Sequence, residues 1–162
     1  MEQIFFVLLS VLILGAALMV VTTRNLLHSA LWLIAAFFGI AGIFILLHAE
    51  FLAVVQVLIY IGAISILIIF AIMLTRRIMD PQQPRFNSQW GLAGGFAALL
   101  FVGLAAVVTR VAWPVATGAP PTDAIQQLGA DFVGVYAVPF EVASVLLVTA
   151  MIGAIIIARE RE

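Results

Sequence analysis

The chain has 162 residues, of which 65% are hydrophobic and only 9% are charged, and its formal net charge is −1. Soluble domains usually have about 25% charged residues, so this composition excludes a soluble globular protein and indicates an integral membrane protein in contact with the lipid bilayer. The nearly neutral charge argues against nucleic acid as a partner. The absence of cysteine excludes disulfides, thiolate metal sites and cysteine-ligated iron–sulfur clusters.

Five apolar stretches are long enough to cross a bilayer, because a spanning helix needs about 20 residues. They cover approximately residues 4–21, 26–47, 51–74, 90–109 and 140–158. The first stretch follows Glu2 without any basic residue, which favours a span over a secretory signal peptide. The sequence therefore predicts an all-α membrane protein, a bundle of five transmembrane helices that forms a single membrane domain over residues 1–162.

The arginines predict the orientation of this bundle. With five spans, one face of the membrane receives only Arg110, and the opposite face receives the other six arginines: Arg24, Arg76, Arg77, Arg85, Arg159 and Arg161. By the positive-inside rule the arginine-rich face is cytoplasmic. We therefore predict a multi-pass protein of the cell (inner) membrane with its N-terminus outside and its C-terminus inside.

The connections and the later spans carry weaker signals. The longest connection, residues 113–139, contains an irregular segment, VATGAPPTD, followed by IQQLGADFVGVY, which fits either a short surface helix or an extended piece. Gly91 and Gly95 form a GxxxG pair, which is typical of close helix packing. Pro139 followed by Glu141 predicts an ordinary N-terminal arrangement for the fifth span, with the acid in its first turn.

The third span carries an unusual set of polar and small residues, namely Glu50, Gln56, Tyr60, Gly62 and Ser65. In a regular helix the spacing puts Gln56 and Tyr60 on one face, and Gly62 and Ser65 on another. Glu50 fits two roles, a solvated helix start or a titratable acid beside a hydrated pocket. Gln56 and Tyr60 fit interhelical hydrogen bonds. Gly62 fits close packing, and it also permits a π-bulge.

No enzyme motif accompanies these residues. The sequence has no glycine-rich phosphate loop, no GxSxG and no HExxH, and His28 and His48 lie at opposite ends of one predicted span, so they cannot share a metal ion. Intramembrane titratable groups are fewer than a self-sufficient carrier usually has. The simplest interpretation is a subunit of a larger assembly, without a metal site or catalytic residues of its own.

The third span also resembles a known family. Its pattern from Glu50 to Leu74, E-F-L-x-x-x-Q-V-x-I-Y-I-G-A-I-x-x-L-x-x-F-x-x-M-L, resembles subunit J of proton-pumping NADH–quinone oxidoreductase, respiratory complex I, the counterpart of mitochondrial chain 6. NLLHSALWLI, from Asn25 to Ile34, is similar to the start of the second span in that family. PFEVASVLLVTAMIGAIIIAR, from Pro139 to Arg159, is similar to its fifth span.

The resemblance implies a non-catalytic membrane-arm subunit that contacts other membrane-arm subunits and makes no contact with NADH. FMN, iron–sulfur clusters and quinone belong to other parts of such a complex. In that family the third span carries a π-bulge around the residues that are Tyr60 and Gly62 here, and it is thought to alternate between bulged and regular forms. The rotation of its lower half is held to open and close a water path that links the quinone site to the proton channels.

The resemblance therefore implies a gating and proton-pathway role for Glu50, Gln56, Tyr60, Gly62 and Ser65. One residue departs from the family pattern, because some members carry Glu where this chain has Gln56. Glutamine cannot exchange a proton, so a gate is favoured over an acid relay, and Glu50 is the only titratable candidate on this span.

Two alternatives belong to other classes of protein. The first is a subunit of a multisubunit cation/proton antiporter or of a membrane-bound hydrogenase, and the second is a purely structural spacer. Within the oxidoreductase interpretation, the electron donor is NADH, ferredoxin or another compound, since related complexes share this type of subunit.

Overall fold

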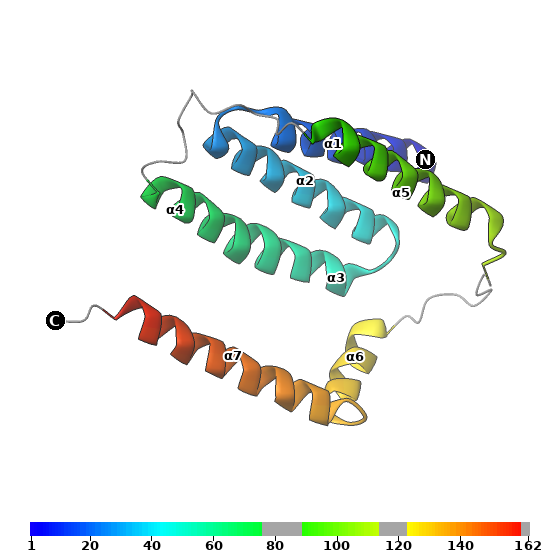
Figure 1. Cartoon of the computed structure of the whole chain (residues 1–162). Coiled ribbons are helices and arrows are strands. Elements are labelled where there is room, and N and C mark those ends of the chain that lie inside the picture. The colour runs from blue at the N-terminus through cyan, green and yellow to red at the C-terminus, as the bar shows by residue number, and fades with distance from the viewer. Residues whose placement is uncertain (76–88, 114–122, 160–162) are drawn as a thin grey trace. The chain divides into compact units, whose positions relative to one another are not determined.

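The computed structural model describes residues 1–75, 89–113 and 123–159, and within these ranges it contains helices and no strand. Figure 1 labels the helices α1 to α7, and the segment named η1 below lies between α3 and α4. Their bounds are α1 Glu2–Thr22, α2 Leu26–Leu46, α3 Glu50–Val55, η1 Gln56–Ser65, α4 Ile66–Leu74, α5 Trp90–Arg110, α6 Ala124–Val133 and α7 Ala137–Ala158.

The all-α architecture with five candidate membrane spans is confirmed. The helices α1, α2, α5 and α7 are each long and apolar enough to cross a membrane, and α3, η1 and α4 together make one continuous span of 25 residues, Glu50–Leu74. Every predicted end lies within three residues of the observed one. Most of the predicted arginine-containing loop after the third span, and almost all of VATGAPPTD, lie outside the described residues.

The chain divides into two compact units, Met1–Thr117 and Gly118–Glu162, which are considered separately below. In the first unit, α1 and α2 form an antiparallel pair with a tight seam. A Cβ added at Gly39 would lie 2.5 Å from Ile13 Cγ1, and one added at Gly42 would lie 2.9 Å from Leu9 Cδ2. The two glycines thus let α1 approach α2 closely, as is common where membrane helices associate by packing alone.

The turn from α2 to α3 fixes where the third span starts. His48 has a φ of 56°, the Ala49 amide donates to the Phe44 carbonyl at 2.9 Å, and the His48 amide donates to the Ile45 carbonyl at 3.0 Å. This pair of hydrogen bonds is the Schellman arrangement at the end of a helix. It leads the chain directly into α3, whose first residue is Glu50, as the sequence predicted.

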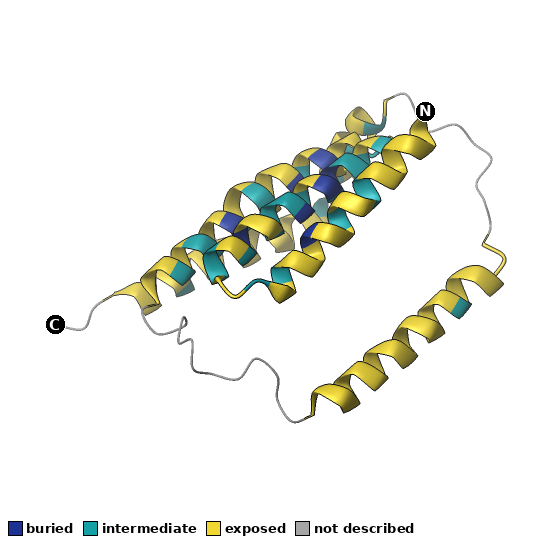
Figure 2. Cartoon of the chain, turned by 90° about the horizontal axis from the view of Figure 1, so that it is seen from above, coloured by how far each residue is buried: buried dark blue, intermediate teal, exposed yellow. Residues whose placement is uncertain are grey.

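The third span packs on α2. Figure 2 shows the buried residues gathered on α1, α2 and the third span. On the third span the buried residues are Ala53, Gln56 and Ser65. In the described part of the first unit, the core therefore consists of small residues and two polar side chains rather than large apolar ones.

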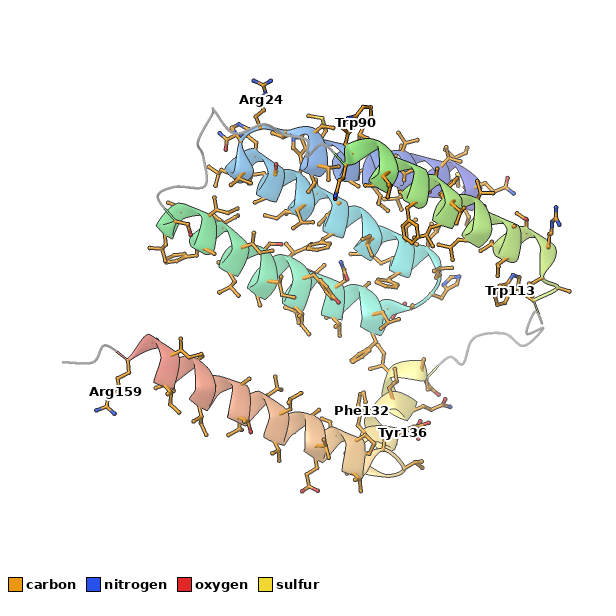
Figure 3. All side chains as sticks on the ribbon, in the orientation of Figure 1. Arg24, Trp90, Trp113, Phe132, Tyr136 and Arg159 are labelled. Atoms are coloured by element: carbon orange, nitrogen blue, oxygen red, sulfur yellow. The ribbon has the colours of Figure 1, made fainter. Side chains whose placement is uncertain are left out.

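In the second unit, residues of IQQLGADFVGVY form the helix α6, which settles the two alternatives left by the sequence. The helix ends with Gly134, and the Tyr136 amide donates to the Asp131 carbonyl at 2.8 Å. The rings of Phe132 and Phe140 lie 5.8 Å apart between centroids and connect α6 to the start of α7. Figure 3 shows Phe132 and Tyr136 beside this turn.

The predicted start of the fifth span needs one correction. The helix α7 begins at Ala137, so Pro139 is its third residue and Glu141 lies beyond the first turn, which contains no acid. Proline is tolerated this early because the first amides of a helix have no intrahelical partner. Glu141 therefore does not have the capping position that its spacing from Pro139 suggested.

The spans α5 and α7 have no buried residue in their most apolar windows. No atom from the rest of the described chain lies within 4 Å of a Cβ placed at Gly91 or Gly95, apart from the local helix backbone. The described part of the first unit therefore places no neighbour against Gly91 or Gly95 of the predicted GxxxG surface. Trp90 and Trp113 lie at the two ends of α5, as Figure 3 shows, which is typical of aromatic residues at the membrane–water interfaces.

Candidate functional site

The middle of the third span is a π-helix of ten residues, Gln56–Ser65. Its backbone joins α3 and α4 without a break, since Val55 and Ile66 on either side have ordinary right-handed helical angles. The π-bulge predicted around Tyr60 and Gly62 is thus confirmed, and it is longer than the single-turn bulges that are usual in proteins.

The Ser65 hydroxyl gives an independent sign of the widened turn. It donates to the carbonyl of Tyr60, five residues earlier, at 2.7 Å. In the α-helical spans, the hydroxyls of the following residues each donate to a carbonyl four residues earlier: Thr22, Thr75, Thr109, Ser144 and Thr149. The side chain of Ser65 follows the backbone spacing, so its partner five residues earlier reflects the π form, whereas in an α-helix the same hydroxyl would donate to the carbonyl four residues earlier.

The π-helix also changes which residues face α2. Gln56 is 6% exposed and Ser65 is 1% exposed, although they are nine positions apart. In a regular α-helix, nine residues make about two and a half turns at 3.6 residues per turn, which puts the two ends on opposite sides. The wider turns of η1 bring both polar side chains to the buried side of the span.

Tyr60 lies at the edge of the buried side. Its side chain is 42% exposed, and its ring meets Phe37 of α2 edge-on, with centroids 5.3 Å apart and an interplanar angle of 66°. Such a pair contributes about 0.5–1.5 kcal/mol beyond area burial. The sequence analysis missed Phe37, because spacing along one helix does not show which ring of another helix faces it.

The prediction that Gly62 and Ser65 share a face does not hold, because Gly62 is exposed while Ser65 is buried. A Cβ at Gly62 would lie 3.4 Å from the Val57 carbonyl of its own helix, an ordinary van der Waals distance, and it would meet nothing else in the described chain. Close packing of Gly62 against another helix is therefore not observed in this part of the chain.

The remaining predicted site residue, Glu50, is exposed and occupies the first turn of α3. The described residues contain no group of three or more His, Cys, Asp or Glu side chains placed to hold a metal ion. What the π segment offers is neutral hydrogen-bonding chemistry. Gln56 as a residue is 6% exposed, and no described side-chain N or O atom is both buried and without a partner, so its side-chain amide remains accessible to water or to another subunit.

Five apolar spans and a π-helical third span define a multi-pass α-helical membrane protein. A family model described as NADH-ubiquinone/plastoquinone oxidoreductase chain 6 matches residues 16–157. The chain belongs to this family, as the resemblance in its third span indicated.

Relatives extend over almost the whole chain. The NAD(P)H-quinone oxidoreductase chain 6 of Synechocystis sp. is 41% identical over 98% of this chain and 81% of that protein. The F(420)H(2) dehydrogenase subunit J of Methanosarcina mazei is 37% identical over 98% of this chain and 92% of that protein. The names of these two relatives refer to different electron donors.

Proposed function

We propose that the chain is a non-catalytic membrane-arm subunit of a complex I-type oxidoreductase and that its third span couples quinone reduction to proton translocation as a conformational and hydration gate. The observation that carries this proposal is the ten-residue π segment that buries Gln56 and Ser65 on one side of an uncharged mid-membrane stretch. A long π segment in the middle of a membrane span is rare, and π-bulges occur frequently at functional sites.

A change from π to α form would rotate α4. Counted from Gln56 at about 3.6 residues per turn, a regular helix would put Ala63, Leu67 and Leu74 on the buried side. In the observed form Leu67 is 69% exposed and Leu74 is 72% exposed. The change would therefore turn the C-terminal part of the span, which includes α4, by about half a turn. It would replace Ser65 with Ala63 and Leu67 on the side that faces α2.

This exchange supports a gate because it changes polarity at mid-depth. The π form brings the Gln56 amide and the Ser65 hydroxyl to the same side, and Tyr60 adds a hydroxyl at its edge. The Gln56 amide has donors and acceptors that an ordered water or a polar group of a neighbouring subunit can satisfy. The α form keeps Gln56 on that side but replaces the Ser65 hydroxyl with the apolar side chains of Ala63 and Leu67, which favour a dry interface.

The chemistry of electron transfer belongs to other subunits in this proposal. The chain has no cysteine, so it supplies no thiolate to an iron–sulfur cluster. FMN, the clusters, the quinone and the site for the electron donor would lie in partner subunits, and this chain would contact the other membrane-arm subunits. The relatives are named for oxidoreductases, which favours this assignment over an antiporter subunit.

The variant Gly62→Val tests the gate. A β-branched side chain at position 62 would lie next to the Val57 carbonyl, which is 3.4 Å from an added Cβ. The Cβ itself makes only ordinary contact there, and the two methyl groups beyond it restrict the local backbone. If they bias the two forms by ~1 kcal/mol, coupled proton translocation should slow about fivefold. Electron transfer from the donor to an artificial acceptor should keep its rate.

The matched control is Gly103→Val in α5, where nothing else in the described chain lies within 4 Å of an added Cβ. Unchanged proton translocation in the Gly62→Val complex would count against the gate. A structural spacer instead predicts that substitutions in the third span alter assembly and never alter coupling in the complexes that do assemble.

Glu50 calls for a separate test of its two roles. Glu50→Gln removes the charge and keeps the shape, so a solvated helix start predicts a loss of about 0.3–1 kcal/mol in stability without loss of coupling. We propose that Glu50 instead belongs to the proton pathway at the outer end of the span, which predicts slower proton translocation at unchanged assembly. Full translocation by the assembled Glu50→Gln complex would remove Glu50 from the pathway.

A further inference from the structure

Two small residues near the C-terminal end of η1 differ in exposure, one being buried and the other exposed. Ser65 is 1% exposed, whereas Ala63, two positions earlier, is exposed. In a regular α-helix these environments would be exchanged. Position 63 lies about two full turns after Gln56, on the buried side, and position 65 lies about two and a half turns after it, on the opposite side.

The buried side leaves little room for a larger side chain. Ser65 is the largest fully buried side chain among the described residues, so the space around position 65 is filled. On α2, Ala30 and Ala41 are buried and lie seven residues before and four residues after Phe37, on the helical face that meets Tyr60. Small residues on both helices therefore keep the third span close to α2 at this depth.

We infer that the sizes of the side chains at positions 63 and 65 set the balance between the π and α forms of the third span. A small residue at 65 is required for the π form, and a small residue at 63 is required for the α form. This inference rests on the proposed gate, which needs both forms, and it identifies Ala63 and Ser65 as the positioning residues of that gate.

Two substitutions should move the balance in opposite directions. Ser65→Leu overpacks the π form and leaves the α form unhindered, and Ala63→Leu does the reverse. Overpacking of a filled site is costly enough that each variant should change the ratio of the two forms at least about tenfold. The measurement is single-particle cryo-electron microscopy of the whole complex in lipid nanodiscs during turnover, with particles sorted by the form of the third span.

Matched variants separate side-chain size from the hydroxyl. Ser65→Ala and Ala63→Ser exchange one small residue for another, so they should leave the ratio within about twofold of the unmodified complex. If Ser65→Leu does not assemble, Ser65→Thr adds a single methyl group and should shift the ratio about fivefold in the same direction. A shift by Ser65→Ala as large as that by Ser65→Leu would overturn the inference, because the hydroxyl would then be decisive.

The same variants distinguish failure of this inference from failure of the gate. An unchanged ratio in Ser65→Leu and Ala63→Leu overturns the size rule, whatever the rate of proton translocation. A ratio that shifts in opposite directions in the two variants supports the size rule. If proton translocation per quinone reduced then stays normal in both, the gate is contradicted while the size rule stands.

Discussion

His48 lies at the junction of α2 and α3, and its φ of 56° is the only positive φ of a non-glycine residue in the described chain. The left-handed region costs most residues about 1–2 kcal/mol, although histidine visits it more often than bulky or β-branched residues do. The Schellman hydrogen bonds of Ala49 and His48 hold this conformation in place. The junction matters because it determines where the third span begins.

We therefore expect His48→Gly to raise the free energy of unfolding by about 1 kcal/mol, because glycine adopts a positive φ without a steric penalty. His48→Val should lower it, because a β-branched residue is strained there. Unfolding by titration with a denaturing detergent measures both variants under the same conditions. A glycine variant less stable than the valine variant would show that the imidazole, and not the backbone, governs this turn.

Among single residues, the sequence identified Gln56, Tyr60, Gly62 and Ser65 as unusual but did not predict their arrangement. Regular helical spacing placed Gly62 with Ser65, whereas the structure buries Ser65 and exposes Gly62. The reason is that spacing rules assume 3.6 residues per turn, and η1 has wider turns. Faces read from a sequence are therefore wrong wherever the helix type changes.

At the scale of helices, the seam between α1 and α2 depends on two glycines. A Cβ at Gly39 would come within 2.5 Å of Ile13 Cγ1, a branch atom close to the backbone that cannot move aside easily. We expect Gly39→Ala to lower the free energy of unfolding by about 1–3 kcal/mol, as overpacking usually does.

Gly15→Ala in α1 provides the matched comparison, because nothing else in the described chain lies within 4 Å of an added Cβ there. Alanine is the better helix former, so this variant should be neutral or more stable by up to about 1 kcal/mol. Equal destabilisation by the two variants, measured by the same detergent titration, would show that helix propensity and not the seam determines the result.

The helices themselves were largely predictable, because long apolar runs bounded by polar turns determine membrane spans almost completely. The start of α7 was not, since Pro139 lies inside the first turn and not before the helix. The π segment was only partly predictable from the sequence. Gly62 and Tyr60 permitted it and the resemblance implied it, but neither indicated its length of ten residues, because residue spacing does not show how far a widened turn extends.

At the scale of the whole molecule, the spans differ in how much of their surface this chain covers. The most apolar window of α2 is 22% buried, whereas those of α5 and α7 have no buried residue. Within their own units, α5 and α7 therefore leave their apolar side chains uncovered. Composition predicted the membrane, but the partners of α5 and α7 are outside the reach of one sequence.

The orientation is a prediction at this scale that a labelling experiment can test. The chain contains no cysteine, so a single introduced cysteine gives an unambiguous label within it. Glu2→Cys should react with a membrane-impermeant maleimide from outside intact cells, and Arg159→Cys should react only after the membrane is opened. The reverse pattern would contradict the N-out, C-in topology.

The central claim is that the third span alternates between two helix types during turnover. The most direct test is cryo-electron microscopy of the unmodified complex, comparing resting particles with particles that are reducing quinone. We predict two classes, one with Ser65 against α2, as in the π-helix described here, and one with Ala63 and Leu67 in that place. A π-helix with Ser65 buried in every class, resting and active, would contradict the account.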